Sequence, residues 1–189
     1  IPAEMKDVAH YFGKEFLREV DEKEFFDHLA DVRAAVKNDR EILRAIHFFK
    51  ENARVPQIVE ALNNDDFDLF KKLIKESGNS SYKFLQNVYA DFDYKNQAVS
   101  LGLAMSEMIL KDHGVCRVHG GGFAGTIQAF VENSYVETYK EEIEKVFGKG
   151  SCHTLGFVHQ EGSFGQMHRY QFCGQHSIAS MQEPEDPYT

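Results

Sequence analysis

The chain has 189 residues, a net charge of −9 and no Trp, and it is long enough to bury one substantial core. Binding to nucleic acids or anionic membranes needs clustered Lys and Arg, so an acidic chain without a basic block argues against both partners. No apolar run approaches the roughly 20 residues that span a bilayer. The first residues also lack the basic start and apolar stretch of a signal peptide.

The ends and the cysteines of the chain suggest its context. The sequence opens on Ile1 without an initiator Met, and we interpret it as a piece of a longer protein. Cys116, Cys152 and Cys173 are an odd, scattered set without a CxxC pair. Such cysteines are typical of reduced thiols in a cytoplasmic protein and not of a disulfide framework.

Residues 1–113 predict a helical region. Apolar residues recur at steps of three and four in 25–36, and the run 40–64 predicts a long helix that Pro56 either kinks or splits. Further helices are expected at 65–78, where Gly78 ends the pattern, and at 94–114. We expect three acidic residues to cap helices at their N-termini: Asp21, Asp39 and Asp66.

Residues 114–156 change to a mixed pattern. Short strands are expected at 115–119, 126–131 and 151–159, and an amphipathic helix is expected at 134–150. This order predicts an α+β fold in which the helical region packs on a small antiparallel sheet. Residues 1–156 would form one domain, and residues 157–189 would be an atypical, partly disordered tail.

A glycine-rich stretch separates the first two expected strands. Four of the six residues from 120 to 125 are glycines, which lose more backbone freedom on folding than any other residue. Three interpretations remain open: a turn that needs positive φ angles, a backbone nest that binds an anion, or a loop that another group approaches closely. The stretch matches neither a dinucleotide-binding fingerprint nor a P-loop. The glycines are Gly120, Gly121, Gly122 and Gly125.

The segment CRVHGGGFAGTIQAFV resembles the third conserved motif of the GHMP kinases and, within them, that of galactokinase. The segments 46–89 and 97–110 are similar to galactokinase in the same order, and the resemblance covers about residues 1–155. His119 stands where the family has Ser or Thr, and Ala124 replaces a glycine. The residues that follow the motif are Arg117, Gly120, Gly122, Phe123 and Gly125.

The resemblance implies the C-terminal domain of a kinase that transfers the γ-phosphoryl group of MgATP to the anomeric hydroxyl of galactose or a related sugar. In that family the active site lies between two domains, and the catalytic residues and phosphate loop belong to the N-terminal one. This chain alone would then be inactive, with ATP, Mg²⁺ and sugar bound through the missing domain. Its active-site loop would be His119, Gly120, Gly121, Gly122, Phe123, Ala124 and Gly125, with Arg117 as a structural or distant electrostatic support.

Two other functional classes remain open. The chain could be a non-catalytic, galactokinase-like module for sugar sensing or protein association. It could also associate with itself through the surface that would face the missing domain, because exposed apolar patches tend to associate. The sequence does not identify the sugar.

Other polar residues have structural interpretations. Only Cys173 and His176 have a short metal-ligand spacing, without a second pair, and we expect no metal site. The segment GNSS at 78–81 is expected to be a turn that ends a helix. His47, Glu51 and Arg54 share a helical face, for which we favour a buried structural network over a contact to the missing domain.

Overall fold

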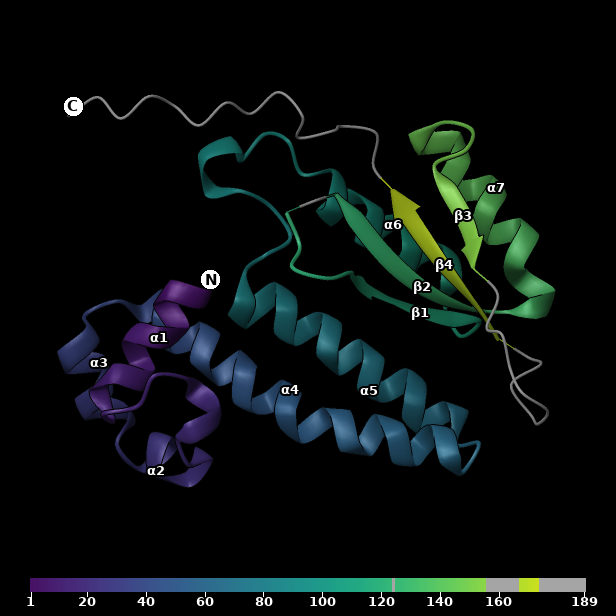
Figure 1. Ribbon diagram of the computed structural model, residues 1–189. Coiled ribbons are helices and arrows are strands. Elements are labelled where there is room, and N and C mark those ends of the chain that lie inside the picture. Colours follow the sequence, from purple (N-terminus) through teal and green to yellow (C-terminus); the bar gives the residue numbers. More distant parts are fainter. Residues whose placement is uncertain (124, 156–166, 174–189) are drawn as a thin grey trace. The chain divides into compact units, whose positions relative to one another are not determined.

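The computed structural model describes residues 1–123 and 125–155, together with the backbone of 167–173 (Figure 1). It divides the chain into two compact units, Ile1–Asn87 and Val88–Thr189. The first unit is helical, and the second contains the sheet, so the expected α+β class with an antiparallel sheet is confirmed.

Unit 1 comprises helices of very different lengths. α4, which is 25 residues long, runs through Pro56 as one continuous helix and packs against α5. The helix predicted at 25–36 is instead two helices, separated at His28. In chain order the elements are α1 (Pro2–Tyr11), η1 (Leu17–Glu19), α2 (Glu22–Asp27), α3 (Leu29–Val36), α4 (Asp39–Asn63), α5 (Phe67–Ser80) and the π-helical turn η2 (Ser81–Leu85).

The core of unit 1 follows the apolar periodicity of its helices. Phe25 and Val32 are fully buried and lie with Phe49 in one cluster, where the Phe25 and Phe49 ring centroids are 5.0 Å apart. Phe25 lies on α2, Val32 on α3 and Phe49 on α4, so each helix turns its apolar face toward this cluster. Short helices that could not persist alone are thus held by their shared apolar face.

The helix ends of unit 1 partly match the predictions. Asp21 and Asp66 cap α2 and α5, because each side chain accepts a hydrogen bond from a backbone N–H three residues later, at 2.9 Å. Asp39 is not a cap: Asn38 occupies that position and accepts from the N–H of Arg40 at 3.1 Å. Gly78 lies within α5, so the turn predicted at 78–81 is also wrong.

Unit 2 is an antiparallel sheet with α6 and α7 packed on it. The strand order is β1-β2-β4-β3, and β1 and β2 form a hairpin (Figure 1). The hairpin and the helix after it were predicted, whereas β4 lies in the segment 157–189 and was not. The elements are η3 (Asp91–Asp93), α6 (Ala98–Leu110), β1 (Gly114–Val118), β2 (Thr126–Glu132), η4 (Asn133–Tyr135), α7 (Val136–Phe147), β3 (Cys152–Leu155) and β4 (Met167–Cys173).

The core of unit 2 is built from alternating strand residues. Cys116 and Val118 of β1 point to the same face as Ile127, Ala129 and Val131 of β2, and all five belong to one buried cluster with residues of α6 and α7. β1 has the period-two burial of a strand with one face on the core, whereas β2 also buries Thr126 and Phe130 on its other face. The strand pattern therefore fixes the register of the hairpin, and with it the position of the glycine-rich loop between β1 and β2.

The remainder of the predicted tail, 157–166 and 174–189, lies outside the described residues, as do Ala124 and Gly156. Among the described helices, none is long and apolar enough to cross a membrane.

Candidate functional site

The glycine-rich loop joins β1 to β2, and we call residues 119–125 the glycine hairpin. Val118 and Ile127 form the last strand pair below it. The backbone N–H of His119 donates to the carbonyl oxygen of Thr126 at 3.0 Å, and the N–H of Gly122 donates back to the carbonyl of His119 at 3.4 Å. The first bond joins the two ends of the loop where it leaves the sheet, and the second closes a turn within the loop.

The backbone of the glycine hairpin explains most of its glycines. Gly120, Gly122 and Gly125 have φ angles of 61°, 72° and 80°, in the left-handed region that costs other residues steric strain. Phe123 also has a positive φ of 51° and is a non-glycine residue held in a strained conformation, with 38% of its surface exposed. The turn interpretation therefore accounts for three of the four glycines.

Gly121 is different. Its φ does not lie in the left-handed region, and in the described part of the chain no atom lies within 4 Å of where its Cβ would be. Neither the turn nor the packing of the described residues thus requires a glycine at 121. Of the interpretations that remain, close approach by a group from outside the hairpin accounts for an exposed position without a side chain.

Arg117 lies on β1, two residues before the hairpin. It is half-buried, it pairs in register with Gln128, and its Nε donates to the carbonyl oxygen of Val118 at 3.1 Å. Because its neighbours Cys116 and Val118 point into the core, the side chain of Arg117 lies on the opposite face of the sheet. This hydrogen bond is to a residue of its own strand.

The described residues contain no group of three or more His, Cys, Asp or Glu side chains that could hold a metal ion. Cys116 and Cys152 are buried free thiols. Burial raises the pKa of the Cys152 thiol to about 11, with the nearby carboxylate of Glu144 acting in the same direction. The Cys152 thiol is thus protonated at neutral pH, which disfavours metal binding and nucleophilic chemistry by this residue. The side chains of Cys173 and His176 are outside the described residues.

The three residues predicted to share one face of α4, His47, Glu51 and Arg54, form polar contacts within unit 1. His47 Nδ1 lies 2.9 Å from Ser80 Oγ, and Ser77 Oγ donates to Glu51 Oε2 at 2.8 Å. Glu51 also pairs with Arg54. The predicted structural network is therefore confirmed. Its partners on α5 were not predicted.

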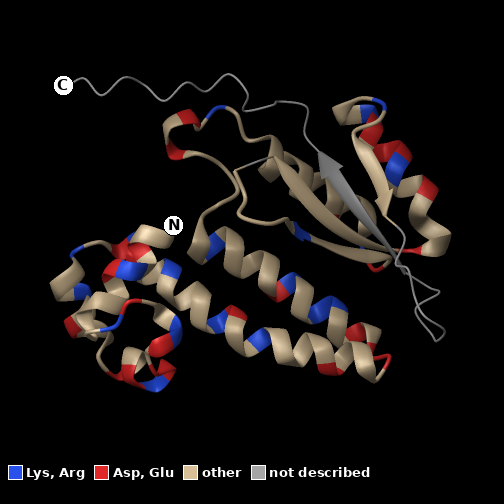
Figure 2. Cartoon of the chain, viewed as in Figure 1, with Lys and Arg blue, Asp and Glu red and all other residues tan. Residues whose placement is uncertain are grey.

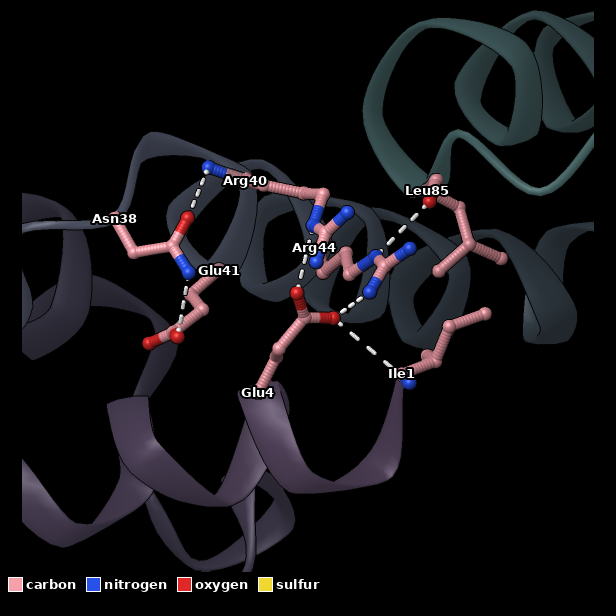
Figure 3. A network of polar contacts seen from close by, with 7 residues as sticks. All are labelled: Ile1, Glu4, Asn38, Arg40, Glu41, Arg44 and Leu85. Carbon is pink, nitrogen blue, oxygen red and sulfur yellow. Dashed lines mark hydrogen bonds and ion pairs between the residues drawn. The ribbon is translucent and has the colours of Figure 1, made fainter. Parts of the chain in front are cut away.

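A second network in unit 1 was not predicted from the sequence (Figure 3). Arg44, which is 5% exposed, pairs with Glu4 of α1, and its Nε donates to the carbonyl oxygen of Leu85 at 3.1 Å. The more exposed Arg40 reaches the same carboxylate at 2.7 Å. One arginine thus ties α4 to α1 and to η2, across 40 residues of sequence in each direction.

Comparison with known proteins relates this chain to bacterial galactokinases. No protein-family model matches it. It is 29% identical over 146 residues to a galactokinase of Glaesserella parasuis serovar 5 (strain SH0165), covering 77% of this chain and 36% of that protein. It is 30% identical over 144 residues to a galactokinase of Haemophilus influenzae (strain PittEE), covering 76% and 35%.

The similarity is to galactokinases. A galactokinase of Actinobacillus pleuropneumoniae serotype 5b (strain L20) is 28% identical over 146 residues, which cover 77% of this chain and 36% of that protein. The resemblance inferred from the glycine-rich motif and the two helical segments is therefore confirmed. The chain spans little more than a third of the length of the curated relatives that it matches.

Proposed function

We propose that this chain is the C-terminal part of a galactokinase-type sugar kinase, which transfers a phosphoryl group from ATP to the anomeric hydroxyl of galactose or a related sugar. Similarity to galactokinases over three quarters of the chain supports the assignment. The observation that carries the role of this part is Gly121, a glycine that the turn and the packing of the described residues do not require.

In this proposal the glycine hairpin is the surface on which the phosphate-handling part of the kinase rests. Absence of a side chain at Gly121 lets a neighbouring backbone or a phosphate approach the loop closely. Phosphoryl transfer depends on positioning and on preorganised dipoles, which a loop anchored to a sheet supplies. The hairpin from His119 to Gly125 shapes the site and moves no proton, and Arg117 stiffens the strand below it.

The residues for MgATP belong, in this proposal, to other parts of the kinase. The described side chains contain no group of three or more His, Cys, Asp or Glu that could hold a metal ion by themselves. We propose that the chain alone is catalytically inactive and that the whole kinase acts in the cytoplasm.

A chimera tests the proposal. The matched stretch of the Glaesserella parasuis galactokinase is exchanged for this chain, and galactose-dependent ATP turnover is measured. We expect activity from the chimera and none from this chain alone. In the chimera, Gly121→Val should lower kcat/KM at least about 100-fold, because displacement of a positioned group by about 1 Å costs that much.

The matched control is Gly120→Val. Gly120 has a positive φ, so a valine there strains the turn and should lower both the unfolding midpoint and the activity. Gly121→Val should leave the unfolding midpoint of this chain unchanged, because no atom of the described residues would meet its Cβ. A folded but inactive chimera, or full activity in Gly121→Val, would contradict the proposal.

A further inference from the structure

The helix α6 is apolar on both its inner and its outer face. Glu107 is the one charged residue among its 13 residues. A helix on a protein surface normally has a polar outer side, whereas a helix that is apolar all round is covered on all sides in the intact protein. The inner face, which lies on the core of unit 2, consists of Val99, Gly102, Ser106 and Leu110.

The outer face of α6 is a stripe of four apolar residues, which we define as Leu101, Ala104, Met105 and Met108. Their spacing of three, one and three places them on one side of the helix. Leu101 is 50% exposed and Met108 is 62% exposed, at the two ends of the stripe. Within unit 2, α6 packs on β1, β2 and α7. The described residues of unit 2 therefore leave this face uncovered, independently of unit 1.

The order of large and small side chains makes the outer face of α6 self-complementary. When two copies of α6 pack antiparallel about a two-fold axis between positions 104 and 105, Leu101 of each copy faces Met108 of the other. The small side chain of Ala104 lies at the centre and lets the two helix axes approach closely. Flexible Met side chains can fill the remaining space. The same four residues thus supply both halves of one interface.

The charge of the chain also favours this face for a contact between copies. A net charge of −9 makes copies repel one another, and the outer face of α6 is uncharged. In the antiparallel pair, the exposed Asp112 of one copy lies level with the start of α6 in the other. That start has no side-chain cap and no acidic residue in its first turn. A carboxylate there stabilises the positive end of the helix dipole.

We propose that the outer face of α6 binds the same face of a second copy of this chain, in an antiparallel two-fold dimer. One helix face per copy is smaller than a standard interface, which buries about 1,600 Å². The dimer is therefore weak, with a Kd between about 1 µM and about 1 mM. This inference is independent of the proposed kinase activity, because it depends only on the surface of unit 2.

Sedimentation equilibrium of the 189-residue chain tests the proposal. Leu101→Lys and Met108→Lys each place a cation against an apolar side chain of the partner, so each should raise the Kd at least about 10-fold. Both positions are exposed in unit 2, so the melting temperature of the monomer should not change. The matched control is Val146→Lys, which makes the same change of charge on α7 at a residue that is 48% exposed. It should leave the Kd unchanged.

Cross-linking tests the position of the axis. Under mild oxidation, Ala104→Cys should form a disulfide between two copies, because both 104 positions lie at the axis. Thr138→Cys, on the exposed side of α7, should give no more cross-linking than the wild-type chain. A chain that stays monomeric up to about 1 mM, or a Kd that neither lysine variant changes, would overturn the proposal. A monomeric chain whose melting temperature falls in Leu101→Lys would also overturn it, because the face would then be covered within one chain.

Discussion

The two units of this chain are stabilised differently. Unit 1 buries charged side chains and gives each a polar partner: Asn38 for Glu41, the carbonyl of Leu85 for Arg44, and Glu51 for Arg54. In the described part of unit 2, none of the buried side chains is charged, and its clearest internal polar contact joins Ser106 to Tyr139 at 2.8 Å. Figure 2 shows both signs of charge along α4 and α5, and mostly uncharged strands β1 and β2.

This difference indicates how each unit obtains a single structure. Short helices with small apolar faces can slide against one another, and directional bonds across their contacts remove that freedom. A sheet already fixes its register through backbone hydrogen bonds and alternating burial, so apolar packing suffices. Substitutions of polar groups should therefore damage unit 1 more than unit 2.

Arg44→Ala should have the largest effect. It leaves the carbonyl of Leu85 and part of the Glu4 carboxylate buried without their partner, and removing one member of a buried pair costs about 3–5 kcal/mol. The free energy of unfolding in urea measures it. Arg40→Ala is the control, because Arg40 reaches the same carboxylate from a more exposed position and should cost less than about 1 kcal/mol. Equal losses would show that burial does not decide the strength of this network.

The second-largest effect is expected at alkaline pH, which should lower the free energy of unfolding of unit 2. The pKa of Cys152 is raised by burial from 9.0 to about 11, so between these values the unfolded chain releases its proton first and stability falls as pH rises. We expect a loss of about 1–2 kcal/mol by pH 11, allowing for partial solvent screening. Burial also raises the pKa of Tyr139, which acts in the same direction above pH 10.

The comparison that isolates Cys152 is its alanine variant. Urea midpoints of wild type and Cys152→Ala are measured from pH 8 to pH 11, and the fall should be smaller in the variant. The arginine pairs of unit 1 keep their charge over this range. A fall of the same size in both proteins would assign the alkaline loss to other groups.

Much of this organisation could be predicted from local sequence pattern. Helical spacing, the caps Asp21 and Asp66, and the change to strands after Gly114 depend on residues within a few positions of one another. The pairing of Glu4 with Arg44 depends on a long-range approach of α1 to α4, which no local pattern encodes. β4 was missed because its neighbours in the sequence show little periodicity.

For the candidate site, the sequence predicted the position of the loop but not which of its glycines the backbone requires. Sequence alone indicated a glycine loop between two strands, and both strands are present. It could not separate the glycines that the backbone requires from Gly121, because that distinction depends on φ angles and on the space around each residue.

Tyr139→Phe should have a moderate effect. Its hydroxyl is hydrogen-bonded to Ser106, which keeps a second bond to the carbonyl of Gly102 at 2.7 Å. Because Ser106 keeps this bond when the Tyr139 hydroxyl is removed, we expect a cost of about 1 kcal/mol in the free energy of unfolding, the net value of one hydrogen bond. A loss as large as that of Arg44→Ala would contradict the view that unit 2 depends mainly on apolar packing.

The smallest effects are expected at the start of α4, where two neighbouring residues differ in role. The Asn38 side-chain oxygen accepts from the N–H of Arg40, and its amide nitrogen donates to the Glu41 carboxylate at 2.7 Å, so Asn38→Ala should cost about 1 kcal/mol. Asp39 pairs with Arg33 at 2.6 Å on the surface, and this bond lowers the pKa of its carboxyl. Such exposed pairs contribute little, so Asp39→Ala should leave the urea midpoint unchanged. Loss of stability in Asp39→Ala without loss in Asn38→Ala would mean that charge at the helix start matters more than the directional cap.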